Sequence, residues 1–206
     1  MTPSIVEATH TRADQIRQYY GWRATNYDAG SRFEVEHHLE AIRRAQIQEG
    51  QRILEVACGT GRATVDLAQA VGEAGHVEAL DLSEAMLEQA RAKLDKAGWS
   101  HRVTFAPGDA RHLPFSDAQF DLLYNGYMFD LIPLEGFAPI LAEFFRVLKP
   151  GGRLVLVNMS KPDNRLTMFE RIYSRGWAVM PCRPVLMSPY LKDAGFVDAD
   201  RLYRPT

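Results

Sequence analysis

The stretch ILEVACGTGRAT, residues 53–64, decides the fold. A strand-like apolar run leads into a turn that holds Gly59 and Gly61, and a segment with helical periodicity follows it. Because glycine has no side chain, the backbone can turn tightly there and approach a ligand closely. The pattern predicts a strand, a turn and a helix, and the turn serves either ligand binding or plain packing.

Glu55 lies inside the strand-like run that precedes this turn. A carboxyl group near the end of a buried strand is costly unless a hydrogen-bonding or cationic partner compensates it. An ammonium group would serve, whereas a phosphate would not. The turn also lacks the Gly-Lys-Ser/Thr ending of a P-loop, and Thr64 occupies the third small-residue position of a dinucleotide fingerprint. The turn therefore suits a cationic amino-acid moiety better than a pyrophosphate.

Strand-like and helical segments alternate along the rest of the chain. The further strands are expected at residues 76–82, 102–107, 120–125 and 153–159, and the helices at 63–71, 84–98 and 137–149. This alternation predicts an α/β, Rossmann-like three-layer sandwich with a mostly parallel central sheet. Ligands are expected at the carboxyl ends of the strands, where the strand order reverses. Later segments predict helices near 166–175 and 190–194 and a last strand at 196–204.

The segment before about Glu49 predicts two polar-rich helices with many aromatic residues, among them Tyr19, Tyr20, Trp22 and Tyr27. It is too short to be a domain with its own core. We therefore expect a single domain over residues 1–206 with an N-terminal helical cap, or lid, over about residues 1–48.

Composition narrows the class of protein. The 206 residues are 46% hydrophobic and 24% charged, which allows one ordinary domain with a sizeable core. The net charge is −2 and the basic residues are scattered, which argues against a nucleic-acid binder and favours small-molecule partners. Two cysteines, Cys58 and Cys182, and the lack of a secretion signal predict a cytoplasmic protein. No apolar run has the length of a membrane span, so any lipid contact is expected to be peripheral.

Asp81 ends the second strand-like run, about 20 residues after the glycine turn. At that spacing a carboxylate can accept both ribose hydroxyls of an adenosine. Ser83 occupies the capping position of the next helix, so we favour ribose binding over a capping role for Asp81. Leu82 and Met86 either flank an adenine ring or belong to the core.

Asp109 and Ala110 follow the third strand-like run. A carboxylate there can accept a hydrogen bond from an adenine amino group, and the next backbone N–H can donate to a ring nitrogen. An isolated Asp in a loop is usually a turn residue. As the third acidic residue at successive strand ends, Asp109 favours a nucleoside site.

Four motifs together resemble the class I S-adenosylmethionine-dependent methyltransferases, specifically the branch of the ubiquinone and menaquinone biosynthesis methyltransferases. They are EVACGTG (55–61), ALDLSEAML (79–87), GDARHLPFSDAQFDLLYN (108–125) and RVLKPGGRLVLV (146–157). The resemblance implies S-adenosyl-L-methionine as cofactor and a small-molecule acceptor such as a quinol, phenol, polyketide or lipid. The family usually ends in an antiparallel pair of strands, whereas only residues 196–204 remain here for a last strand.

The resemblance also implies roles for individual residues. The methionine portion would lie along Ala57, Gly59 and Gly61 with Thr64 beneath it, the ribose on Asp81, and the adenine on Asp109 and Ala110. Tyr27 and Tyr20 would close over the methionine end as part of a lid, and Asn125 would lie beside the methyl group. We expect Tyr127 and Tyr20 to be the catalytic residues, and residues 127–130 to form the acceptor wall.

The histidine and cysteine side chains allow other kinds of site. His37 and His38 are adjacent on a helix and point in different directions, and no HExxH spacing appears, so no metal site is expected. His112 is the one histidine expected near the pocket, as a partly exposed loop residue rather than a catalytic one. Cys58 is expected to be a small packed residue rather than a nucleophile. Two alternative functions stay open. One is a nicotinamide-dependent oxidoreductase, in which Asp109 would have no role. The other is a protein that binds the cofactor without catalysing methyl transfer.

Overall fold

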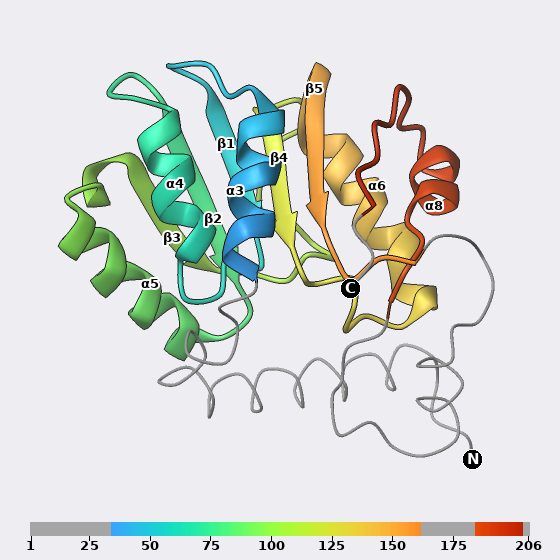
Figure 1. The fold of residues 1–206 in the computed structure, drawn as a ribbon, viewed down its shortest axis with the longest axis horizontal. Coiled ribbons are helices and arrows are strands. Elements are labelled where there is room, and N and C mark those ends of the chain that lie inside the picture. The colour runs from blue at the N-terminus through green and yellow to red at the C-terminus, as the bar shows by residue number, and fades with distance from the viewer. Residues whose placement is uncertain (1–33, 162–183, 204–206) are drawn as a thin grey trace.

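A five-stranded sheet in the order β3-β2-β1-β4-β5 forms the centre of the computed structural model, which describes residues 34–161 and 184–203 (Figure 1). Each strand runs parallel to its neighbours. The strands are β1 (Arg52–Val56), β2 (His76–Asp81), β3 (Val103–Pro107), β4 (Phe120–Gly126) and β5 (Leu148–Val157). The predicted α/β fold with a mostly parallel sheet is confirmed.

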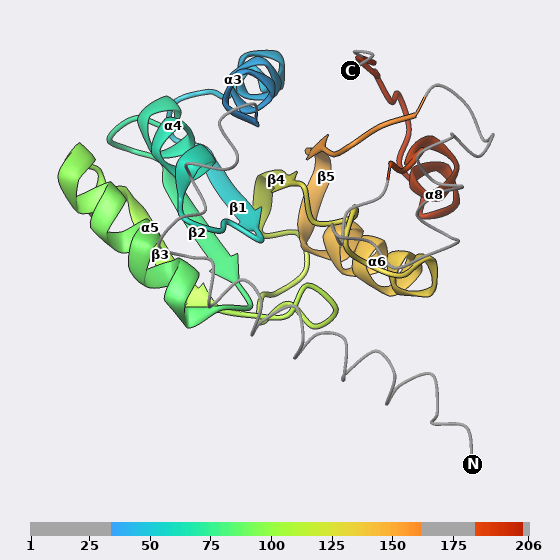
Figure 2. The ribbon, with the colours of Figure 1, turned by 60° about the horizontal axis from the view of Figure 1, so that its bottom comes forward.

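Helices cover both faces of this sheet (Figure 2). One face carries α3 (Glu34–Ala45), α4 (Arg62–Ala70) and α5 (Glu84–Ala97), and the other carries α6 (Phe137–Val147) and α8 (Ser188–Asp193). Two short 3₁₀ turns, η2 (Ser100–Arg102) and η3 (Leu134–Gly136), precede β3 and α6. Among the helices in the described ranges, none is long and apolar enough to cross a membrane.

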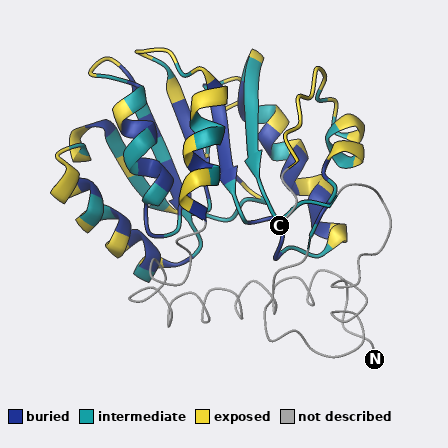
Figure 3. Cartoon of the chain, in the orientation of Figure 1, coloured by how far each residue is buried: buried dark blue, intermediate teal, exposed yellow. Residues whose placement is uncertain are grey.

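The central strands are apolar on both faces because both faces are covered. In β1, Ile53 belongs to the core on the side of α4, whereas Leu54 and Val56 belong to the core on the side of α6. Figure 3 shows the inner strands as buried and the outer helix surfaces as exposed. Glu55 is therefore an acidic residue among the buried apolar residues of β1.

The strand order determines where a ligand can bind. The chain builds β1, β2 and β3 outward in one direction and then returns to place β4 on the other side of β1. The order reverses between β1 and β4, and such a switch point opens a crevice at the carboxyl ends of the strands.

The predicted last strand is wrong as far as the structure describes it. Residues 196–203 form no strand, since Asp198 has a left-handed φ of 53° and Val197 is 80% exposed. Side chains hold the segment instead: Arg201 donates to the Ser160 hydroxyl at 2.8 Å and Arg44 pairs with Asp200. Apolar and polar residues alternate there without a neighbouring strand to pair with.

Other predicted boundaries shift or lie outside the described residues. The short helix expected at 190–194 is α8, which begins at Ser188 with a proline in its first turn. Strand β5 begins five residues before the expected Arg153. Residues 34–45 of the expected cap form α3, which packs against the sheet beside α4. Residues 1–33 of the cap, with Tyr20 and Tyr27, lie outside the described ranges, as do the helix expected at 166–175 and Cys182.

Candidate functional site

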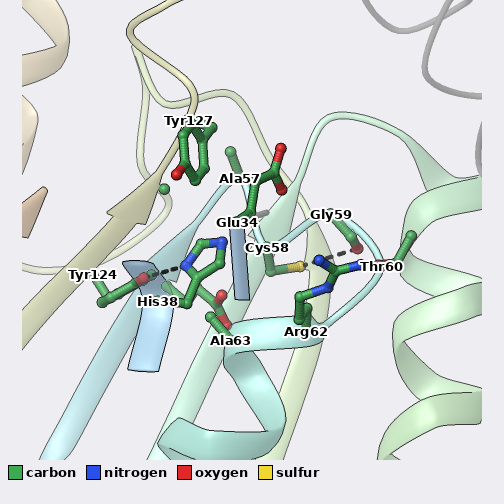
Figure 4. Close-up of a pocket in the computed structure, with 12 residues that line it drawn as sticks. Glu34, His38, Ala57, Cys58, Gly59, Thr60, Arg62, Ala63, Tyr124 and Tyr127 are labelled. Atoms are coloured by element: carbon green, nitrogen blue, oxygen red, sulfur yellow. Dashed lines mark hydrogen bonds between the residues drawn. The ribbon is translucent and has the colours of Figure 1, made fainter. Parts of the chain in front are cut away.

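A pocket lies at the switch point, between the carboxyl ends of β1 and β4 (Figure 4). Three parts of the chain line it: the start of α3, the glycine turn after β1, and the end of β4. The lining residues are Glu34 and His38; Glu55, Ala57, Cys58, Gly59, Thr60, Arg62 and Ala63; and Tyr124, Gly126 and Tyr127. Of the residues expected to form the site, the structure brings Glu55, Ala57, Gly59 and Tyr127 together here.

Glu55 is the most deeply buried acid of this pocket, with 2% of its surface exposed. Its Oε2 atom has no hydrogen-bond partner among the residues that the structure describes. Burial raises the pKa of Glu55 to about 8; Thr64 opposes this rise, and the nearby carboxyl groups of Asp81 and Asp66 add to it. The carboxyl group is therefore mostly protonated at neutral pH and would ionise beside an incoming cation.

The two glycines of the turn have different surroundings. Both have left-handed φ angles, 56° at Gly59 and 76° at Gly61, as does Ala57 at 59°. A Cβ atom on Gly59 would meet no atom of the described residues within 4 Å, whereas one on Gly61 would lie 2.8 Å from the Cβ of Ala90 on α5. Gly59 thus leaves open space beside the pocket. Gly61, which does not line the pocket, allows α4 and α5 to pack closely.

Asp81 joins the end of β2 to the glycine turn. Its Oδ2 accepts a hydrogen bond from the N–H of Gly59 at 2.8 Å, and its Oδ1 accepts one from the N–H of Ser83 at 2.9 Å. Burial raises the pKa of Asp81, and these N–H groups oppose that rise. Ser83 makes no side-chain capping bond, so the argument that it relieves Asp81 of capping was wrong. Each carboxylate oxygen still has a second lone pair for a hydroxyl group.

Asp109 is paired within the protein. Its carboxylate accepts hydrogen bonds from the Arg111 backbone N–H at 3.0 Å and from the Arg111 Nε at 2.9 Å. Burial acts to raise the pKa of Asp109, but the bonds from Arg111 lower it overall. Ala110 packs against the core on the α6 side. Both residues follow β3, outside the pocket lining.

The remaining expected cofactor residues also lie outside the pocket lining. Thr64 is fully buried at the start of α4, Leu82 is half-buried after β2, and Met86 is 2% exposed within α5. Asn125 is buried, and its side-chain amide donates to the carbonyl oxygen of Val56 at 2.8 Å. This bond joins the end of β4 to the end of β1.

Fewer residues than expected form the acceptor wall of the pocket. Tyr127 is half-buried and lines the pocket. Met128 and Phe129 belong to the core on the α6 side, and Asp130 is 1% exposed and accepts from the N–H of Met159 at 3.0 Å. Only Tyr127 of this loop therefore lines the pocket.

Two histidines of α3 hold two tyrosines of β4 and its following turn. His38 is hydrogen-bonded through Nδ1 to the hydroxyl of Tyr124, and His37 through Nδ1 to the hydroxyl of Tyr127 at 2.7 Å. Burial, together with Arg62 and His37, lowers the pKa of His38 to about 4, so its ring is neutral at pH 7. Burial also raises the pKa of Tyr124 well above its usual value.

His112 was expected to be the one histidine near the pocket, which is wrong, whereas its expected place as an exposed loop residue is confirmed. His112 is exposed, and His38 lines the pocket instead. Sequence reasoning missed Glu34, His38 and Arg62 because their place depends on how α3 and α4 pack. One signal was available: Glu34 and His38 are four residues apart, which puts them on the same face of a helix.

Cys58 is a packed residue, as expected. It is 6% exposed, and burial together with Glu55 and Asp81 raises the pKa of its thiol well above the usual value. A thiol that resists ionisation is a poor nucleophile.

Comparisons with known sequences point to one family, and a solved structure shares the fold. A model of the ubiE/COQ5 methyltransferase family matches residues 34–197. Demethylmenaquinone methyltransferases of Listeria welshimeri and Anoxybacillus flavithermus are 32% and 34% identical over 75% and 84% of this chain. The chain spans 66% and 70% of the length of these two relatives. A crystal structure of a SAM-dependent methyltransferase from Aquifex aeolicus is 24% identical with a TM-score of 0.67, and the match covers 85% of this chain and 87% of that one.

Proposed function

Because the chain belongs to the ubiE/COQ5 methyltransferase family, we propose that it methylates a quinol-type small molecule with S-adenosyl-L-methionine as the methyl donor. Membership of this family supports the predicted class of enzyme and gives no support to a nicotinamide-dependent oxidoreductase. The choice of a quinol follows the two relatives, which are named for demethylmenaquinone. The observation that carries the proposal is the buried carboxyl group of Glu55 at the switch point of the sheet, one oxygen of which has no partner in the described part of the chain.

The side chains at the carboxyl edge of the sheet carry the chemical groups that the cofactor needs. Glu55 would hold the ammonium group, and the space beside Gly59 would admit the methionine backbone. Asp81 would accept the ribose hydroxyls, and Asp109 and Ala110 would receive the adenine. When bound, the cofactor supplies a methyl group on a positively charged sulfur, which a nucleophilic carbon or oxygen displaces in line.

The protein's own contribution is then to align the acceptor, exclude water and handle one proton. An aromatic hydroxyl must lose its proton for its ring carbon to become a strong nucleophile, and its usual pKa is near 10. Tyr127 places a polar group beside the pocket for this purpose. Asn125 keeps the ends of β1 and β4 together, which fixes the distance between the glycine turn and Tyr127.

Calorimetry and a transfer assay test the proposal on the full chain. We expect heat from S-adenosylhomocysteine, none from NAD, and transfer of labelled methyl groups to a naphthoquinol. Tight NAD binding without heat from S-adenosylhomocysteine would overturn the cofactor assignment. Binding of S-adenosylhomocysteine without transfer to quinols, phenols or phospholipids would establish the remaining alternative, a cofactor-binding protein without turnover.

A further inference from the structure

The hydrogen bond between Tyr127 and His37 leads from the pocket to a partly exposed side of α3. The Tyr127 hydroxyl and the His37 Nδ1 are 2.7 Å apart. Tyr127 lines the pocket, whereas His37 does not line it and is half-buried. If the Tyr127 hydroxyl took up a proton from the pocket, the Nδ1 of His37 could therefore accept a proton from it on the side away from the pocket.

Tyr127 is held in an uncommon backbone conformation. Its φ of 53° lies in the left-handed region, which bulky residues rarely adopt. Its N–H donates to the carbonyl oxygen of Val157 at 2.6 Å, and the ring of His38 packs edge-on against its ring at 5.5 Å between centroids. Strain that is kept in place by such contacts is typical of functional positions.

Gly126 and His38 bring α3 close enough for His37 to reach Tyr127. A Cβ atom on Gly126 would lie only 2.6 Å from the Cε1 of His38, so a glycine is needed where α3 approaches β4. The bond from His38 to Tyr124 then anchors the helix (Figure 4). Gly126 precedes Tyr127 in the sequence, and His38 follows His37. Contacts of these two neighbours therefore position the Tyr127–His37 pair.

The charged groups around the pair favour a neutral tyrosine. Glu34 on α3 and Asp130 in the loop after β4 add to burial in raising the pKa of Tyr127. Arg62, at the start of α4, and His37 both disfavour a proton on His38, whose pKa is about 4. A neutral phenol can accept one proton while it donates its own, and His38 does not compete for that proton.

We propose that Tyr127 and His37 form a proton relay for the hydroxyl group of an aromatic acceptor, an inference that rests on the proposed function. The acceptor O–H bond breaks and its proton joins the Tyr127 hydroxyl oxygen. The original phenol O–H bond breaks at the same time, and that proton forms a bond with the His37 Nδ1. The imidazolium later gives a proton to water. The electron pair left on the acceptor oxygen makes the ring carbon nucleophilic, and no oxidant or reductant is needed.

In this relay Tyr127 touches the acceptor and is catalytic, whereas His37 acts through Tyr127. The relay matters only when the acceptor arrives protonated. An acidic phenol, which is already ionised in solution, has no proton to pass on. The acceptor's own acidity therefore separates a relay from a structural role.

The test compares the wild-type chain, His37→Gln and Tyr127→Phe on a series of naphthols with different hydroxyl pKa values. We expect both variants to lower kcat by about 100-fold with weakly acidic naphthols, the lower range for general acid–base catalysis, and far less with acidic ones. Their kcat should rise with pH as the acceptor ionises, with KM little changed. His101→Gln makes the same substitution at an exposed residue away from the pocket and should behave as wild type.

Two measurements without turnover complete the test. Calorimetry with S-adenosylhomocysteine should give the same affinity for the variants as for the wild type. Nitrogen NMR on labelled histidines should show an accepting Nδ1 on His37 that changes in Tyr127→Phe.

Three results would overturn the relay. In the first, the wild-type chain methylates the series and His37→Gln matches it at every acidity, which leaves the proposed function standing. In the second, both variants lose activity equally with all naphthols. In the third, the wild-type chain methylates none of them, which overturns the proposed function as well.

Discussion

Glu55 and Tyr124 are register partners on β1 and β4, and Glu55 contributes to the raised pKa of the Tyr124 hydroxyl. Tyr124 belongs to the core on the α3 side of the sheet and is hydrogen-bonded to His38. A buried acid, a buried phenol and a neutral imidazole thus lie next to one another at the switch point. The protonation states of these groups therefore affect both the stability of the free protein and the affinity of the pocket for a ligand.

Glu55 makes the protein less stable as pH rises. Its folded pKa of about 8 exceeds the ordinary value of 4.5, so its contribution is fully present below pH 4.5 and is lost as pH rises through 8. We expect the free energy of unfolding of the wild type, relative to Glu55→Gln, to fall between these pH values by on the order of 3 to 5 kcal/mol. Urea unfolding of both chains at several pH values measures this. Parallel curves would mean that Glu55 is ionised in the free protein.

Cofactor binding should release a proton from Glu55. Below pH 8 the free carboxyl group is protonated, and an ammonium group beside it favours the ionised form. The affinity for S-adenosylhomocysteine should therefore increase from pH 6 to about pH 8. Calorimetry in buffers of different ionisation enthalpy measures the released proton, which Glu55→Gln should abolish. Equal proton release by that variant would place the ionising group elsewhere.

The two turn glycines should separate binding from stability. Gly61→Ala places a Cβ 2.9 Å from the Cα of Ala90, a backbone atom that cannot move aside, and we expect a loss of roughly 2 to 4 kcal/mol of stability. Gly59→Ala meets no atom of residues 34–161 and 184–203 within 4 Å, so only the left-handed φ is expected to cost stability, about 1 to 2 kcal/mol. Its main effect should be weaker cofactor binding. Thermal unfolding and calorimetry on both variants check this, and equal losses of affinity would contradict it.

Asp81→Ala should weaken cofactor binding by roughly 2 to 4 kcal/mol, because a carboxylate that bridges two hydroxyls makes charge-assisted bonds. The variant should also lose about 1 to 2 kcal/mol of stability, since the N–H groups of Gly59 and Ser83 lose their acceptor. Asp81→Asn, which keeps one acceptor oxygen, serves as the control. An unchanged dissociation constant in a folded Asp81→Ala chain would mean that Asp81 only stabilises the glycine turn.

The sheet could be predicted because strand and helix periodicities are local properties of the sequence. The expected strand at 76–82 matches β2, His76–Asp81, within one residue. The strand expected at 196–204 shows the limit of such patterns, because a strand also needs a neighbour with which to pair. The left-handed Asp198 interrupts the extended backbone there, and nothing in the local alternation reveals it.

The site could be predicted in part. Four pocket residues could be predicted from the sequence because each lies at or near the end of a strand: Glu55, Ala57, Gly59 and Tyr127. The spacing of Glu34 and His38 puts them on one face of a helix, but their place in the pocket depends on how α3 packs against the sheet and α4. The lid with Tyr20 and Tyr27, the cytoplasmic location and the roles of single residues in cofactor binding stay predictions.

The bond between His38 and Tyr124 should stabilise the fold rather than bind the cofactor. Both groups are buried, so His38→Ala leaves a buried phenol hydroxyl without its partner, which we expect to cost about 1 to 3 kcal/mol beyond the lost packing. Tyr124→Phe removes the hydroxyl and should restore part of this loss when combined with His38→Ala. A double-mutant cycle in urea measures the coupling energy of the pair. Additive losses would show that the two side chains are stabilised independently, and that α3 is anchored by other contacts.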